Sequence, residues 1–135
     1  MESFLGKYST YFYALLRIIS GLMFAMHGSQ KLFGIPGHKP PMDLLLKVGG
    51  VIELVGGLLV ALGLLTGYAA FIASGMMAVA FFKEHFPRPE GILPILNRGE
   101  LAVLYCFLFL YIASVGSGTW SLDRLIHRPK HSLRA

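Results

Sequence analysis

Long apolar stretches alternate with short polar segments along this chain. Apolar residues dominate from about residue 11 to 33, from 48 to 82 and from 98 to 116. A bilayer core about 30 Å thick is crossed by roughly 20 mostly apolar helical residues. The pattern therefore predicts helices that span a membrane.

The middle stretch is too long for a single crossing. One helix over residues 48–82 would be about 52 Å long at about 1.5 Å per residue, so the chain has to fold back on itself. The sequence Thr66-Gly67-Tyr68 is the expected break, because glycine tolerates the conformation that ends a helix. We therefore expect four helices, over about residues 11–33, 42–65, 68–86 and 98–116.

Composition supports a membrane protein and limits its size. Of the 135 residues, 55% are hydrophobic and 14% are charged, and the mean hydropathy is +0.63, whereas a soluble domain carries about 25% charged residues. This length fits one domain, residues 1–135. The expected fold class is all-α, an integral membrane four-helix bundle with antiparallel up-down topology.

The connection between the third and fourth helices has a different character from the helices. Residues 86–100 contain three prolines and two glycines, so they do not form one continuous helix. Several of these residues are nevertheless too apolar for a free loop. We expect an interfacial loop that lies on the membrane surface, either as a plain connection or as a functional cover.

Charge gives an orientation and excludes one class of partner. The net charge is +5, but no basic helix with interleaved aromatic residues occurs, so the lipid bilayer and not nucleic acid is the expected partner. Residues 120–135 form a basic tail, and basic residues beside a membrane helix favour the cytoplasmic side. Both termini are therefore expected in the cytoplasm.

Two charged residues lie inside the apolar stretches. Arg17 and Glu53 each stand about ten residues, or about 15 Å of helix, from the polar end that the first two helices share. At that depth an unpaired charge is costly, so we expect an intramembrane ion pair between them. The pair either clamps the two helices together or takes part in binding or proton movement.

Further polar residues are expected at the face opposite the termini. The first helix, the third helix and the fourth helix all place polar side chains at this face. We expect one polar pocket there, covered by residues 86–96. Its candidate binding residues are His27, Gln30, Lys31, His85 and Glu100.

Cofactor chemistry within this chain is restricted by its cysteine and histidine content. Cys106 is the single cysteine, which excludes an internal disulfide, a CxxC pair and covalent haem attachment. His27 and His85 lack the spacing that places two ligands on one helix face. We expect no haem, no tightly bound metal and no covalently bound cofactor.

Four segments together carry a resemblance to a known family. They are LLRIISGLMFAMHGSQKLFG, GGVIELVGGLLVALGLLTGYAA, NRGELAVLY and GTWSLD, and they extend from Leu15 to Asp123. With these segments the chain resembles the DoxX family of small four-helix membrane proteins. The motif positions are Arg17, His27, Gln30, Lys31, Glu53, His85, Glu100, Ser121 and Asp123. One departure is Gly67, where relatives often carry arginine.

The resemblance implies a function class. Members include a subunit of thiosulfate:quinone oxidoreductase and proteins of thiol-oxidant complexes. The implied role is a membrane subunit or accessory protein of an oxidoreductase complex in the bacterial inner membrane, which works with redox protein subunits and is not catalytic alone. A quinone is the expected ligand, in a cleft beside Arg17, His27, Lys31 and Glu53. The alternatives are a non-catalytic packing subunit and a small-molecule or ion carrier.

Overall fold

Helices joined by short connections make up the computed structural model, which describes residues 4–41 and 43–127. No strand occurs in these ranges. In chain order the elements are the turn η1 (Gly6–Tyr8), α1 (Ser9–Phe33), α2 (Leu44–Val51), the π-helical turn η2 (Ile52–Gly56), α3 (Gly57–Leu62), α4 (Thr66–Ala80), the π-helical turn η3 (Phe81–His85), α5 (Pro94–Asn97), α6 (Glu100–Val115) and α7 (Leu122–Ile126).

Three helical segments in the described residues are long and apolar enough to cross a membrane. They span Gly6–Phe33, Leu44–Leu62 and Thr66–His85. The second of them combines α2, η2 and α3, and the third combines α4 and η3. Helix α6 is also apolar but has 16 residues, about 24 Å at about 1.5 Å per residue. All-helical architecture is confirmed, with three segments of membrane length.

Glycines bring α1 into direct backbone contact with the second long segment. A Cβ atom on Gly57 would lie 2.5 Å from Ala25 N, and one on Gly21 would lie 2.6 Å from Ala61 N. One on Gly28 would overlap the backbone of Leu54. Small residues at such crossings let helices approach closely where burial from water offers no driving force.

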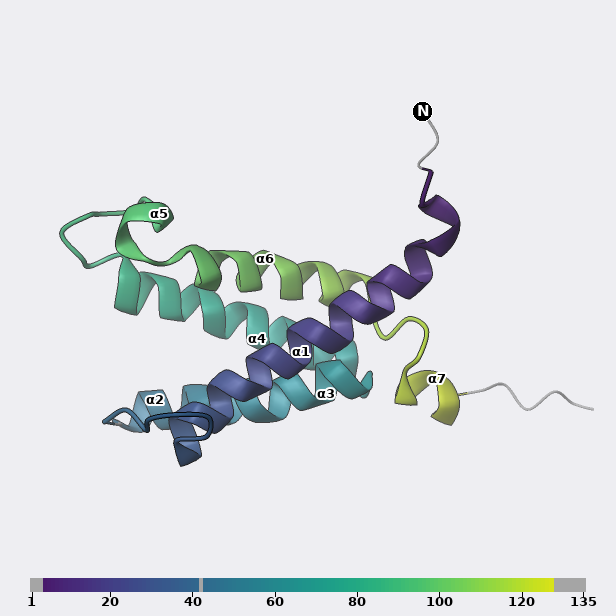
Figure 1. Ribbon diagram of the computed structural model, residues 1–135, viewed down its shortest axis with the longest axis horizontal. Coiled ribbons are helices and arrows are strands. Elements are labelled where there is room, and N and C mark those ends of the chain that lie inside the picture. Colours follow the sequence, from purple (N-terminus) through teal and green to yellow (C-terminus); the bar gives the residue numbers. More distant parts are fainter. Residues whose placement is uncertain (1–3, 42, 128–135) are drawn as a thin grey trace, which may run out of the picture.

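The other two long helices, α4 and α6, lie side by side along their length (Figure 1). On the α4 side the contact consists of small residues, including Ala69, Ala70 and Ala73. On the α6 side it consists of large ones, including Tyr105 and Phe109. Interdigitated small and large side chains fill this interior, which Phe24 of α1 and Val60 of α3 complete.

The break between the second and third long segments falls earlier than the sequence predicts. Helix α3 ends at Gly63, whose φ of +71° is the left-handed conformation that glycine adopts easily. Helix α4 begins at Thr66, so Gly67 lies inside its first turn. The reasoning from glycine was right about the kind of break, but it selected the wrong glycine.

The segment after η3 is not a continuous helix, as its prolines predict. Turns lead to α5, and the buried side chain of Asn97 holds them together. Its Nδ2 donates to Gly91 O at 2.8 Å, and its Oδ1 accepts from Gly99 N at 2.8 Å. Ile92 and Ile95 remain 59% and 71% exposed, so these side chains do not fold inward over a polar pocket.

Two predicted elements extend past the described residues. The second helix was predicted to begin at residue 42, which lies outside them, and α2 begins at Leu44. Of the predicted basic tail, residues 120–127 are described and contain α7. Residues 128–135 lie outside the described residues.

Candidate functional site

A buried ion pair joins α1 to the second long segment. Lys31 Nζ donates to Glu53 Oε1 at 2.6 Å. The side chain of Glu53 is 3% exposed and that of Lys31 is 26% exposed. The close crossing at Gly28 places Lys31, one turn further along α1, within reach of the carboxylate in η2.

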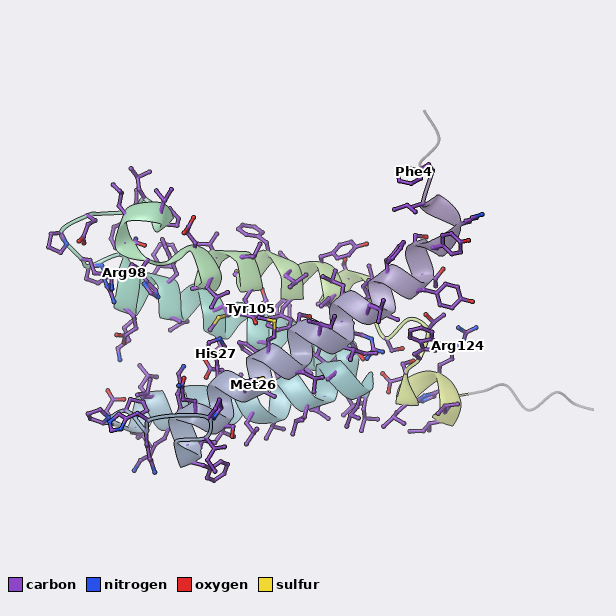
Figure 2. The ribbon with its side chains drawn as sticks, in the orientation of Figure 1. Phe4, Met26, His27, Arg98, Tyr105 and Arg124 are labelled. Atoms are coloured by element: carbon purple, nitrogen blue, oxygen red, sulfur yellow. The ribbon has the colours of Figure 1, made fainter. Side chains whose placement is uncertain are left out.

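Beside this pair lie two buried polar atoms with no hydrogen-bond partner among the described residues, Glu53 Oε2 and the hydroxyl of Tyr105. His27 connects the two, because it lies one helical turn before Lys31 on the same face of α1. The ring of His27 stands edge-on to that of Tyr105 with their centroids 6.4 Å apart, near the middle of the molecule (Figure 2). Lys31, Glu53, Tyr105 and His27 thus form one polar group, here called the interior cluster.

A cleft of about 740 Å³ opens next to the interior cluster, between the second long segment and α4. Lys31 contributes to its wall. The remaining wall is mainly apolar and includes Leu45, Val48 and Ile52 on one side and Ile72, Met76 and Val79 on the other. We refer to it as the α2–α4 cleft. It combines an apolar slot with Lys31, which the buried carboxylate of Glu53 holds in place, and with the exposed charged side chains of Asp43, Lys83 and Glu84.

Arg17 does not pair with Glu53, so that prediction is wrong. Its guanidinium is fully buried and donates to Val60 O at 2.6 Å and Ala61 O at 2.9 Å. It also donates to Trp120 O at 2.7 Å. The charge therefore stabilises carbonyl groups at the C-terminal end of α3, where a cation is favourable.

Helix register explains why the pair does not form. Arg17 lies about 16 residues from the end of α1 at Phe33, which is about 24 Å of helix. Glu53 lies about nine residues from the start of α2 at Leu44, which is about 14 Å. The predicted depth of Arg17 was counted from the polar residues near the end of α1, which begin at His27, and not from the helix end at Phe33. This placed Arg17 too close to the level of Glu53.

The final motif, GTWSLD, lies beside Arg17 at the end of the molecule where α3 ends. Asp123 N donates to Gly63 O at 2.9 Å, and the Asp123 carboxylate accepts from Leu65 N at 3.0 Å. Ser121 Oγ donates to Gly118 O at 2.8 Å, and Ser121 is the N-cap residue of α7. Together with Arg17, these residues hold the turn between α3 and α4. Their contacts are structural.

The five residues predicted to share one pocket lie in different environments. His27 and Lys31 belong to the interior cluster. Gln30 Nε2 donates to Pro36 O at 3.1 Å in the following loop. His85 Nδ1 lies 3.1 Å from Asn97 O, and the His85 ring stacks on the ring of Phe81. The side chain of Glu100 is exposed. Within the described ranges, no hydrogen bond or ion pair joins the first two to the other three.

Tyr105 is the member of the interior cluster that sequence reasoning missed. It occupies the buried face of α6 with Ala102, Phe109 and Ile112, at the spacing of one helix face. A tyrosine on an otherwise apolar buried stripe is a usable signal, because its hydroxyl usually needs a partner. No group of three or more potential metal-ligating side chains occurs in the residues that the structure describes. The absence of a bound metal stays a prediction.

Comparison with known proteins identifies the family. The DoxX family model matches residues 12–85, more than half of the chain. The chain belongs to the DoxX family. The matched part of this DoxX protein contains α1, the second long segment and the third, and so includes Lys31 and Glu53.

Curated relatives agree with a membrane location. The chain is 46% identical over 125 residues to an uncharacterized protein of Haemophilus influenzae, covering 88% of this chain and 93% of that protein. It is 32% identical to inner membrane protein YqjF of Escherichia coli, covering 73% and 70%. It is also 32% identical to uncharacterized membrane protein Rv3486 of Mycobacterium tuberculosis, covering 84% and 80%. No solved structure matches the chain. This DoxX protein is an integral membrane protein.

Proposed function

We propose that this DoxX protein is the membrane subunit of an oxidoreductase complex and binds a quinone in the α2–α4 cleft. The observation that carries the proposal is the position of Lys31. Lys31 lines a mainly apolar cleft, and its ammonium group is held by the buried carboxylate of Glu53.

The residues present fit a quinone. A quinone head group presents carbonyl acceptors, and its tail is apolar. Lys31 carries three N–H donors, one of which is directed at Glu53 Oε1, so two remain for a carbonyl oxygen. The apolar wall from Leu45 to Val79 suits the tail, and about 740 Å³ is within the usual range of about 300 to 1,000 Å³ for ligand sites.

Electrons have to come from another subunit. Cys106 is the single cysteine, and a quinone accepts electrons only from a donor. The proposal therefore includes a partner with flavin, metal or thiol chemistry. Contact with such a partner is supported by the exposed apolar residues of the segment after η3, among them Ile92 and Ile95.

The topology that accompanies this proposal has four crossings with both termini in the cytoplasm. Its support is the apolar character of α6, together with its close packing against α4 along their length. Local thinning of the bilayer and the loop residues that flank α6 make up the difference between about 24 Å and a bilayer core of about 30 Å.

Native mass spectrometry of the gently solubilised complex tests the proposed function. Wild-type protein is compared with Lys31→Met and with Lys47→Met, which removes an exposed charge of α2 that is not part of the cleft wall. We expect a redox partner and a quinone-mass adduct with the wild type. The adduct should persist in Lys47→Met and be lost in Lys31→Met, with the folded state of each variant checked by circular dichroism.

Two other outcomes would replace the proposal. A complex without quinone indicates a packing subunit. Transport by the purified chain alone in vesicles indicates a small-molecule or ion carrier.

A further inference from the structure

The interior cluster contains more unsatisfied polar atoms than a clamp between helices requires. Glu53 and Tyr105 are 2% and 4% exposed, and one oxygen of each has no hydrogen-bond partner within residues 4–41 and 43–127. Buried polar atoms are nearly always paired, either with protein or with an internal water. Glu53 Oε2 is an acceptor and the Tyr105 hydroxyl is a donor, so a water molecule that lies between them would satisfy both.

The backbone at Glu53 provides a second, independent observation. Glu53 lies in η2, a π-helical turn between two α-helical segments. Such turns are rare and are frequently found at functional sites. An ordinary α-helix would clamp α1 equally well, so the π-helical turn points to a use of this carboxylate beyond holding two helices together.

Glu53 lies between two different surroundings. Its Oε1 contacts Lys31, which lines the α2–α4 cleft. Its Oε2 is buried without a partner among the described residues, and Tyr105 packs against His27, one helical turn before Lys31 on the same face of α1. The carboxylate can therefore exchange a proton with the interior through one oxygen and with the cleft through the other.

We infer that Tyr105, Glu53 and Lys31 form a proton-transfer path into the α2–α4 cleft, with a water molecule between the Tyr105 hydroxyl and Glu53 Oε2. Lys31 and Glu53 carry the proton, and Tyr105 positions the water. The use of the proton rests on the proposed function, because reduction of a quinone to a quinol consumes two electrons and two protons.

The partner's flavin, metal or thiol donor supplies two electrons to the quinone. For one of the two protons, an N–H bond of Lys31 breaks and an O–H bond forms on the reduced carbonyl oxygen beside it, which leaves a neutral amine. Glu53, protonated through the water, then returns a proton to Lys31 Nζ across the 2.6 Å contact. Solvent replaces the proton of the water and supplies the second proton to the other carbonyl oxygen, so that one quinol takes up two electrons and two protons.

Few other ionisable groups face Glu53, which makes its protonation measurable. Among the elements that pack against η2, α1 carries Lys31, His27 and the remote Arg17, and α2 carries the exposed Lys47. The elements α3 and α4, which also pack against η2, carry no Asp, Glu, Lys, Arg or His. The two other carboxylates at the cleft, Asp43 and Glu84, are 67% and 59% exposed, so a signal from a buried carboxyl group in this part of the described structure can be assigned to Glu53.

Acid–base infrared difference spectroscopy of the purified protein tests the path without any quinone. We expect a protonated-carboxyl band that is lost in Glu53→Gln and shifted in Tyr105→Phe. The controls are Glu90→Gln, which changes an exposed loop acid, and Tyr111→Phe, which changes an exposed tyrosine of the same helix. Both should leave the band unchanged.

The Tyr105→Phe variant keeps the path falsifiable even if Glu53→Gln fails to fold. It retains the ring that stacks on Phe109 and removes only the hydroxyl. A band that Tyr105→Phe leaves in place and unshifted contradicts the water-mediated contact. A difference spectrum with no band that depends on Glu53 contradicts the path as a whole.

A second measurement separates this inference from the proposed function. In the native complex, Glu53→Gln should keep its affinity for a short-chain quinone and form quinol about 100-fold more slowly, the order expected for loss of a proton-transfer group. If wild-type protein binds no quinone, the proposed function fails and the infrared result still decides the path. If the variant forms quinol at the wild-type rate, the path is wrong.

Discussion

Removing Lys31 and Glu53 one at a time shows which cation neutralises the buried carboxylate. The Lys31→Met substitution leaves Glu53, whose side chain is 3% exposed, without its partner. Breaking a buried pair costs about 3 to 5 kcal/mol, against about 1 kcal/mol or less for an exposed pair. Because the Lys31 side chain is 26% exposed, we expect the lower end, about 3 kcal/mol.

A double-mutant cycle then isolates the interaction. Residues in contact show coupling energies of about 0.5 to 3 kcal/mol, whereas distant residues add within about 0.5 kcal/mol. We expect about 2 kcal/mol of coupling between Lys31→Met and Glu53→Leu. Arg17→Leu and Glu53→Leu should simply add, because Arg17 donates to backbone carbonyls of α3 and of the loop before α7.

The assay is the free energy of unfolding of the purified protein in mixed micelles, measured for wild type, the three single variants and the two double variants. The helical content of each variant is checked first, so that the six proteins share one folded state. Coupling between Arg17 and Glu53 that equals or exceeds the coupling between Lys31 and Glu53 would refute the observed pairing.

Three further predictions follow from the fold. Gly28→Ala should lower the free energy of unfolding by about 2 kcal/mol, because the added Cβ overlaps the backbone of Leu54. Gly75→Ala should leave it unchanged or raise it, because nothing lies within 4 Å of the added Cβ. Unfolding in micelles compares the two variants, and equal losses of stability would contradict the helix contact. Asp123→Ala should cost about 1 kcal/mol in the same assay, since Leu65 N loses its acceptor, and an unchanged stability contradicts this role. Protease-accessible tags at Pro40 and at the C-terminus should be found on opposite sides of the membrane, with the C-terminus inside; tags on one side exclude four crossings.

Much of the helical architecture follows from the sequence because lipid leaves few alternatives. Backbone polar groups in a bilayer have to be satisfied internally, so apolar stretches of about 20 residues become helices. The prediction of residues 11–33 therefore agrees with α1 to within two residues. The predicted break before α4 lies a few residues after the observed one, because both Gly63 and Gly67 can adopt the conformation that ends a helix. Only the contact of Gly63 with Ser121, remote in sequence, selects between them.

The candidate site was less predictable, because its contacts depend on helix register. A shift of about four turns between α1 and the second long segment decides whether Glu53 meets Arg17 or Lys31. That register is fixed by the backbone contacts of Gly21, Gly28 and Gly57. The sequence displays these glycines but does not say which residue each one faces. Tyr105 was missed because it joins the cluster from α6, a helix that predictions about the first two helices do not include.

Light-activated crosslinking with an azido-quinone shows directly whether the α2–α4 cleft binds a quinone. After illumination, peptide mapping by mass spectrometry locates the labelled residues. We expect label in α2, η2 and α4, around Val48, Ile52 and Met76. Unlabelled quinone should compete with the label, which should be strongly reduced in Lys31→Met but not in Lys47→Met. Label confined to other surfaces, or label that unlabelled quinone does not displace, would contradict it.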